Sequence, residues 1–310
     1  MSEQTLIRDV SLRDGLQSLS RVVPTEVKKQ WLQGLYDSGV RAVEAGSFVP
    51  PRLMPQLADT ADIVAFGRTL PGLDITVLVP NLKGAMRAFE SGADAMLVPL
   101  SASHAHSLAN LRKTPDEVLA EIAAICRERD ASGSRCRIEV GLSTAFGCTI
   151  QGRVEPDEVM RLLQAVLDAG VDQAGLADTV GYADPLMVSR LFERGRALAG
   201  ERLACAHFHD TRGMGVANAF AAWQQGVREF DASAGGIGGC PHAPGASGNV
   251  STEDVAWLMA SMGQPTGIDF DALMTLRARI ARWLDGEALH GAIARAGLPK
   301  TLRAPAVNAS

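Results

Sequence analysis

The chain has 310 residues, of which 46% are hydrophobic and 21% charged, a composition typical of a globular protein with a large buried core. Its net charge of −5, without a basic stripe, argues against a nucleic-acid partner, and no apolar run is long enough to span a membrane. Five widely spaced cysteines without a CxxC pair, and an amino terminus without a signal-peptide pattern, predict free thiols and a cytoplasmic location.

A recurring junction organises the sequence: a helix-like segment ends at a glycine and a β-prone run follows at once, as at Gly39, Gly92, Gly170 and Gly226. Glycine is favoured just past a helix end because it adopts the left-handed conformation at little cost. In chain order, we predict strands at residues 6–10, 40–45, 75–79, 95–99, 137–142, 173–177, 203–206 and 229–232. Helices are predicted at residues 25–37, 57–68, 82–90, 114–131, 156–168, 185–198, 214–225 and 252–262, with an extra helix at 269–284.

Eight strands that alternate with eight helices indicate parallel pairing through right-handed crossovers. An open, doubly wound sheet is the alternative arrangement for this pattern. The count of eight, and a length of about 250 residues plus an extension, favour a closed (β/α)₈ barrel, or TIM barrel, of the α/β class. We expect this barrel in residues 1–265 and a short C-terminal helical extension, with a frayed tail, in residues 266–310.

Polar residues that could perform chemistry gather just after the predicted strands, which is where (β/α)₈ barrels hold their active sites. Each has a plainer explanation when taken alone. Asp14 could belong to a turn, Glu44 could pair with Arg13, Asp178 could cap a helix and Cys240 could be an inert thiol. Independent plain roles would not all fall on one rim of the barrel, so we expect a site there. Its candidate residues are Arg13, Asp14, Glu44, Asn81, Asp178, His207, His209, Cys240 and Asn249.

The pair His207 and His209 lies at the end of a predicted strand. Residues two apart on a strand point to the same face, so the two imidazoles should converge, although the pair alone could equally bond to backbone or water. A carboxylate, two imidazoles and an amide oxygen form a mixed shell without thiolate, which suits Mg²⁺ or Mn²⁺ better than structural zinc. With a nearby arginine for an enolate oxygen and a thiol and carboxylate for proton transfer, this set is suited to C–C bond chemistry next to a carbonyl.

From about residue 5 to residue 285 the chain resembles the 3-hydroxy-3-methylglutaryl-CoA (HMG-CoA) lyase family of metal-dependent TIM-barrel lyases and synthases. The resemblance rests on RDGLQ at residues 13–17, SFV at 47–49, PNLKG at 80–84, ADTVG at 177–181, HFHDT at 207–211, and GGCP at 238–241 followed by GASGN at 245–249. Cys240 favours the lyase branch over the synthases. A synthase is also disfavoured because such enzymes carry a long regulatory domain after the barrel, and a non-catalytic barrel would leave the metal set, arginine and thiol without a use.

The resemblance implies a role for each member of the site. Asp14, His207, His209 and Asn249 would hold a divalent metal, Mg²⁺ or Mn²⁺. Arg13 would stabilise the enolate-like oxygen with support from Glu44, Asp178 would abstract the hydroxyl proton with His207, and Cys240 would protonate the acetyl-CoA carbanion from a mobile loop. Residues implied to contact the acyl-CoA substrate are Gln17, Phe48, Asn81, Lys83, Ser101 and Ser103.

The implied reaction is a retro-Claisen cleavage of an HMG-CoA-like thioester to acetyl-CoA and a keto acid, which is acetoacetate for the parent substrate. The resemblance also implies a homodimer. The sequence departs from the family pattern at His104, Thr149, His242 and Pro244. These positions belong to loops expected on the substrate side, so a lyase for another branched 3-hydroxyacyl-CoA is an alternative, as is an acetyl-CoA-condensing synthase of the same superfamily.

Overall fold

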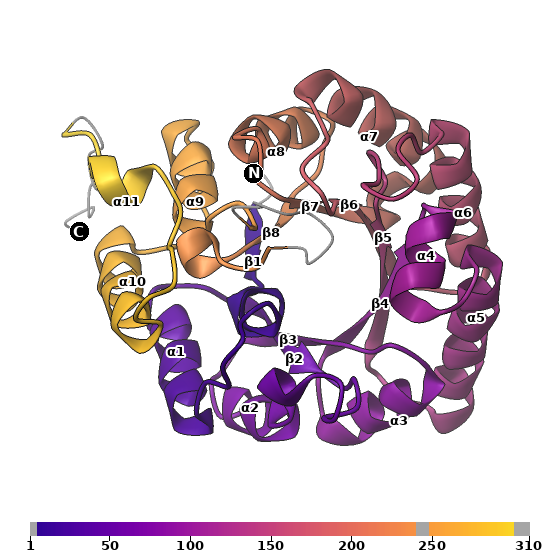
Figure 1. Ribbon diagram of the computed structural model, residues 1–310, viewed down its shortest axis with the longest axis horizontal. Coiled ribbons are helices and arrows are strands. Elements are labelled where there is room, and N and C mark those ends of the chain that lie inside the picture. The colour runs from indigo at the N-terminus through magenta and orange to yellow at the C-terminus, as the bar shows by residue number, and fades with distance from the viewer. Residues whose placement is uncertain (1–4, 240–247, 301–310) are drawn as a thin grey trace, which may run out of the picture.

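The computed structural model describes residues 5–239 and 248–300, which form a closed barrel of eight parallel strands in the order β1 to β8. Each strand pairs with the next, and β8 pairs with β1, so no sheet edge is left open (Figure 1). The predicted TIM barrel is therefore confirmed. The strands are β1 Leu6–Asp9, β2 Ala42–Ser47, β3 Asp74–Leu78, β4 Ala95–Ser101, β5 Arg137–Ser143, β6 Gln173–Asp178, β7 Leu203–Phe208 and β8 Glu229–Ala232.

Helices surround the barrel and follow the strands in sequence (Figure 1). They are α1 Thr25–Asp37, α2 Thr60–Gly67, α3 Leu82–Ser91, α4 His104–Leu111, α5 Pro115–Ser132, α6 Pro156–Asp168, α7 Pro185–Ala199, α8 Gly215–Gln224, α9 Thr252–Ser261, α10 Phe270–Trp283 and α11 Ile293–Ala296. Four short turns are also present: η1 Ser11–Gly15, η2 Pro55–Leu57, η3 Gly200–Arg202 and η4 Ala234–Gly236. No helix within the described ranges combines the length and the apolarity that a membrane crossing requires.

The core lies between the strands and the apolar faces of the helices. In α6, residues spaced three and four apart (Val159, Leu162, Leu163 and Val166) are all fully buried and join the same apolar cluster as Leu142 of β5. Burying each such side chain contributes about 1.5 to 3 kcal/mol relative to exposing it. The helical spacing in the sequence therefore sets which face of the helix packs on the barrel.

Several element boundaries differ from the predicted ones. The helix predicted to start at residue 57 starts at Thr60, because Pro55 opens the short turn η2 and the Thr60 hydroxyl bonds to the Leu57 carbonyl at 2.7 Å. The helix α4 was not expected, and it begins after Ser103, whose side chain accepts the N–H of His106. Strand β7 continues two residues past its predicted end, to Phe208.

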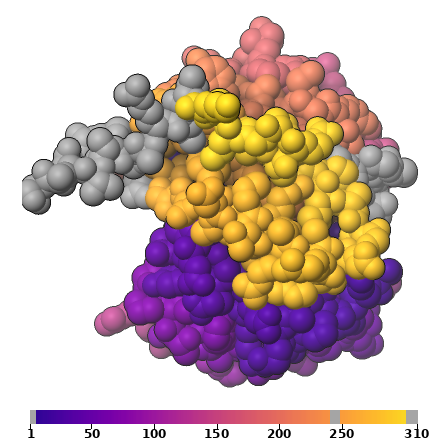
Figure 2. All heavy atoms as spheres, turned by 90° about the vertical axis from the view of Figure 1, so that its left-hand side faces the viewer, coloured from indigo at the N-terminus to yellow at the C-terminus, as the bar shows by residue number. Residues whose placement is uncertain are grey.

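The C-terminal extension packs back on the barrel domain. The ring of Trp283 in α10 stacks on Trp31 of α1 with centroids 6.0 Å apart. The carboxylate of Asp254 in α9 accepts the N–H groups of Ala292 and Ile293 at 2.8 to 3.0 Å, which fixes the start of α11. Figure 2 shows the yellow C-terminal segment lying across the indigo N-terminal part of the chain and the orange segment that contains α9.

All four predicted junction glycines adopt a left-handed backbone, with φ of 90° at Gly39, 79° at Gly92, 94° at Gly170 and 87° at Gly226. A Cβ at Gly39 would lie 2.0 Å from the carbonyl oxygen of Gly267, which precedes α10. At this junction glycine is needed both for the backbone angle and for the close approach of the C-terminal extension.

We expect Gly39→Ala to lower the free energy of unfolding by about 2 to 4 kcal/mol, because backbone strain adds to the collision with Gly267. Gly72→Ala is the matched control, since Gly72 also has a positive φ (73°) but has no atom within 4 Å of an added Cβ. That control should lose only about 1 kcal/mol. Urea unfolding measures both losses, and equal losses for the two variants would contradict a role for close packing at Gly39.

Candidate active site

Asp14 reaches the carboxyl-terminal mouth of the barrel on a short π-helical turn. Strand β1 ends at Asp9, and the N–H groups of Arg13 and Asp14 in η1 then donate to the carbonyl of Val10 at 3.1 and 2.8 Å. Single π-type turns of this kind interrupt regular structure and are frequent at functional sites. The turn is buried, and it carries the side chains of Arg13 and Asp14 to the same place.

The two histidines converge, as their spacing predicted, and both face Asp14. Nε2 of His207 lies 3.8 Å, and Nε2 of His209 3.6 Å, from Oδ2 of Asp14. The imidazole centroids are 5.2 Å apart. One ligand atom from each of the three residues lies within 4.8 Å of the others. Asp14, His207 and His209, called the metal group below, could therefore hold a metal ion.

Asn249 joins the three residues from the segment after β8. It forms an antiparallel bridge with His209, and its Nδ2 donates to Oδ2 of Asp14 at 2.7 Å and to the carbonyl of Ile237 at 3.0 Å. Its Oδ1 is buried and accepts no hydrogen bond from the described residues. A buried amide oxygen without a donor, next to a carboxylate and two imidazoles, fits the oxygen and nitrogen donors that a divalent cation prefers.

Gly238 allows the segment after β8 to approach η1. Its φ is 102°, and a Cβ there would lie 2.6 Å from Nδ2 of Asn249 and 2.7 Å from the carbonyl oxygen of Asp14. Any larger residue would push Asn249 and Asp14 apart. The glycines after β8 therefore serve here in backbone packing around the candidate metal group.

Arg13 links the metal group to a buried carboxylate on β2. Its Nη2 lies 2.7 Å from Oε2 of Glu44, and its Nη1 lies 2.6 Å from Oδ1 of Asp14. Burial opposes ionisation of Asp14, but Arg13 and the two histidines outweigh it and hold the pKa of that carboxyl well below its usual range. Asp14 is therefore ionised, as a metal ligand would be, and Glu44 is the ion-pair partner of Arg13, the plainer role considered for it from the sequence.

Asp178 lies at the end of β6 and is 1% exposed. Its carboxylate accepts the N–H groups of Tyr182 and Ala183 at 2.8 and 3.0 Å, whereas Asp184 caps α7. Asp178 is therefore not the cap of the following helix. Burial raises its pKa above the usual value for aspartate, despite those two hydrogen bonds and the nearby histidines. A carboxylate with a raised pKa is a better proton acceptor than an ordinary one.

The residues expected to contact an acyl-CoA differ in their surroundings. Gln17 donates to Oδ1 of Asp14 and so belongs to the metal group's immediate neighbourhood. Phe48 is buried beneath the guanidinium of Arg87, 4.6 Å from its ring centroid, and Lys83 is exposed on α3.

Asn81 and Ser103 cap α3 and α4, accepting the N–H groups of Gly84 and His106. The Ser101 hydroxyl lies 3.0 Å from Nδ1 of His106. Substrate contacts by these residues stay a prediction. Cys240, His242 and Pro244 lie outside the described residues.

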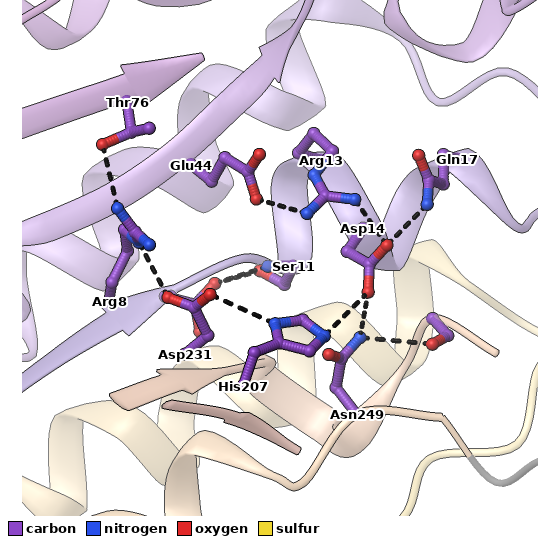
Figure 3. A network of polar contacts seen from close by, with 12 residues as sticks. Arg8, Ser11, Arg13, Asp14, Gln17, Glu44, Thr76, His207, Asp231 and Asn249 are labelled. Atoms are coloured by element: carbon purple, nitrogen blue, oxygen red, sulfur yellow. Dashed lines mark hydrogen bonds and ion pairs between the residues drawn. The ribbon is translucent and has the colours of Figure 1, made fainter. Parts of the chain in front are cut away.

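Two residues of the site were missed by the sequence analysis. They are Asp231 of β8 and Arg8 of β1. Oδ2 of Asp231 lies 3.1 Å from Nδ1 of His207, and Nε of Arg8 donates to Oδ1 of Asp231 at 2.7 Å (Figure 3). The signal in the sequence was the alternation of charged residues in the last predicted strand, at Glu229 and Asp231, which places charge inside the barrel. This alternation does not show which residues of the neighbouring strands the two carboxylates contact.

The closed barrel and the polar group at its mouth define a TIM-barrel enzyme equipped to hold a divalent metal. The family model described as HMGL-like matches residues 4–280, and the chain belongs to this family. Lyases of hydroxymethylglutaryl-CoA recur among its relatives, in agreement with the resemblance found from the sequence.

Two relatives and one solved structure illustrate the similarity. The chain is 38% identical to hydroxymethylglutaryl-CoA lyase of Pseudomonas mevalonii over 280 residues, covering 89% of this chain and 91% of the relative. It is 36% identical to (R)-citramalyl-CoA lyase of Chloroflexus aurantiacus over 305 residues, covering 95% of each. The structure of an HMG-CoA lyase from Acinetobacter baumannii in complex with coenzyme A and 3-methylmalate matches with a TM-score of 0.91 and 37% identity, covering 98% of this chain and 100% of that one.

Proposed function

We propose that this protein is a divalent-metal-dependent lyase that cleaves an HMG-CoA-like thioester to acetyl-CoA and a keto acid, acetoacetate for the parent substrate. The observation that carries the proposal is the group of Asp14, His207 and His209, with the free Oδ1 of Asn249 and the guanidinium of Arg13 beside it, in a member of the HMGL-like family. The relatives named as HMG-CoA lyases support this substrate class.

In this proposal Asp14, His207, His209 and Asn249 hold the metal, which is Mg²⁺ or Mn²⁺ because the donors are oxygen and imidazole nitrogen without thiolate. When bound, the metal supplies Lewis-acid polarisation of substrate oxygens. The buried, ionised Asp14 provides the negative charge that attracts a cation to this place.

The chain's own residues account for the movement of protons and charge. Asp178 takes the proton from the hydroxyl on C3 of the substrate, while His207 contributes as a metal ligand. The C2–C3 bond then breaks, C3 becomes a ketone, and the electron pair passes into the thioester as an enolate whose oxygen is stabilised by Arg13, itself held by Glu44. Cys240 delivers a proton to C2 to give acetyl-CoA.

A substrate with an acyl group other than that of HMG-CoA is also supported. Two departures from the family pattern, His104 and Thr149, flank the strand ends of β4 and β5, and the relative from Chloroflexus aurantiacus is named for (R)-citramalyl-CoA. The second candidate function is therefore cleavage of another branched 3-hydroxyacyl-CoA by the same residues. The proposal includes acyl-CoA contacts by Gln17, Phe48, Asn81, Lys83, Ser101 and Ser103, a homodimer, and a cytoplasmic location.

A thioester panel tests the function. We expect the purified protein to release acetyl-CoA and one keto acid per turnover from HMG-CoA or from another 3-hydroxyacyl-CoA of the panel. Chelation should abolish the release, and Mg²⁺ or Mn²⁺ should restore it, because polarisation of the substrate oxygens depends on the bound metal. Chromatography of both products measures the outcome. Failure to cleave any thioester with metal bound contradicts the proposal, and CoA release from acetyl-CoA plus a keto acid would indicate a synthase instead.

A further inference from the structure

We propose that Asp231, held by Arg8, is a positioning residue that selects the tautomer of His207 and orients it for metal binding. This inference rests on the metal site of the proposed function. Figure 3 shows the three side chains in a row, leading from the barrel interior to Asp14.

The register of the barrel brings these residues together. His207 of β7 is the pairing partner of Asp231 of β8, and Asp231 is in turn the pairing partner of Arg8 of β1. Neighbouring residues in register on parallel strands point to the same face, so three adjacent strands present the three side chains side by side. Oδ2 of Asp231 lies 3.1 Å from Nδ1 of His207, and its Oδ1 accepts Nε–H of Arg8 at 2.7 Å.

The charge of Asp231 determines where the histidine proton lies. Oδ1 of Asp231 forms an ion pair with Nε of Arg8 at 2.7 Å, and this buried contact pairs the carboxylate charge with a guanidinium. An ionised carboxylate can only accept hydrogen bonds, so the contact with His207 requires a proton on Nδ1. The other nitrogen, Nε2, then carries the lone pair, and this is the nitrogen that lies 3.8 Å from Oδ2 of Asp14. The imidazole is thus prepared as a metal ligand.

Arg8 stabilises the buried carboxylate of Asp231. Arg8 is 6% exposed, and its guanidinium also contacts Glu139 of β5, so one cation lies between two buried carboxylates. Without Arg8, the buried charge on Asp231 would lose its ion-pair partner. Nδ1 of His209 has no hydrogen-bond partner among the described residues, so this orienting contact is specific to His207 within that part of the chain.

A purely structural ion-pair network is the competing explanation. It predicts that removing a carboxylate from the barrel interior changes stability without changing metal binding. The control is Asp74 at the start of β3, a partly exposed carboxylate that lines the same hollow as Arg8 and pairs with Arg137 at 2.7 Å but makes no contact with a histidine. Comparing Asp231→Asn with Asp74→Asn therefore separates positioning from structural support.

The experiment titrates chelator-treated full-length protein with Mn²⁺ and follows free Mn²⁺ by EPR. We expect Asp231→Asn to weaken Mn²⁺ binding by about 10- to 100-fold, the usual effect of losing a partner of a metal-ligating histidine. Asp74→Asn should leave the affinity within about twofold, since it changes no contact of His207. Equal affinities of wild type and Asp231→Asn overturn the positioning role, and absence of Mn²⁺ binding by the wild type overturns the metal site and this inference with it.

A measurement on the wild type covers the case in which Asp231→Asn fails to fold. The chain has six histidines, and long-range ¹H–¹⁵N NMR of the Mg²⁺-loaded protein reports which ring nitrogen of each carries a proton. With His207→Gln to assign the signal, we expect a protonated Nδ1 and a bare Nε2 for His207. A proton on Nε2 overturns the inference.

Discussion

Replacing Arg13 with methionine is expected to reduce kcat about 10²- to 10³-fold, the usual effect of removing a group that stabilises a developing oxyanion. Arg13 is 7% exposed and lies at the mouth of the barrel next to Asp14, so its charge acts in a site with little water. KM should change much less than kcat, because the enolate oxygen develops its charge only in the transition state. Steady-state kinetics with the thioester that gives the highest rate measures both parameters.

Arg13→Lys is the matched variant, since it keeps the positive charge but loses the fork that contacts Glu44 and Asp14 together. We expect it to recover only part of the lost rate. Arg13→Met also leaves Glu44 buried without its cation, which costs about 3 to 5 kcal/mol of stability, so folding is checked by urea unfolding. A folded Arg13→Met protein with kcat within tenfold of wild type would contradict the role of Arg13.

Asp14→Asn should remove tight Mn²⁺ binding and lower kcat/KM about 10²- to 10⁴-fold, because the site loses its charged ligand and several kcal/mol of transition-state stabilisation. The variant keeps the shape of the side chain, so it leaves the turn η1 in place. Mn²⁺ titration by EPR and product formation measure the two effects on the same preparation.

Asp184→Asn is the control for Asp14→Asn. Asp184 is an exposed aspartate that accepts backbone N–H groups as the cap of α7 and contacts none of Asp14, His207 and His209. Asparagine is nearly as good a cap as aspartate, so Mn²⁺ affinity and activity should both stay unchanged. If Asp14→Asn binds Mn²⁺ as tightly as Asp184→Asn, the assignment of Asp14 as a ligand is wrong.

The barrel and the place of its site could be predicted from the sequence because both follow from short-range patterns. Eight repeats of one strand–helix unit indicate closure, and the carboxyl ends of parallel strands meet at one mouth. That rule was enough to predict that His207 and His209 would lie near Asp14, which is almost 200 residues away in the sequence. The same rule predicted that Asn249, in the segment after the last strand, would lie near these residues.

Local features without strong periodicity were missed. The helix α4 has eight residues, too few for a clear apolar repeat, and its start is fixed by the Ser103 hydroxyl rather than by packing. The π-helical turn η1 is defined by hydrogen bonds to the carbonyl of Val10, and no residue type in the sequence is specific to such a turn. Asn81 was read as a substrate contact, although an asparagine directly before a helical segment is also a cap signal.

The contacts among Arg8, Asp231 and His207 could not be predicted from the sequence for a different reason. Each residue is one charged or polar position in a short strand, and only the register of three strands shows that they meet. Register in a closed barrel depends on all eight strands together, so no single segment contains this information.

The most direct test of a metal site built from η1, β7 and the segment after β8 is pulsed EPR of Mn²⁺ bound to protein labelled with ¹⁵N-histidine. We predict couplings from two directly coordinated imidazole nitrogens in the wild type, since His207 and His209 each offer one nitrogen to the group with Asp14. His207→Gln and His209→Gln should each retain a single such coupling. Mn²⁺ bound without any coordinated histidine nitrogen in the wild type would contradict the site.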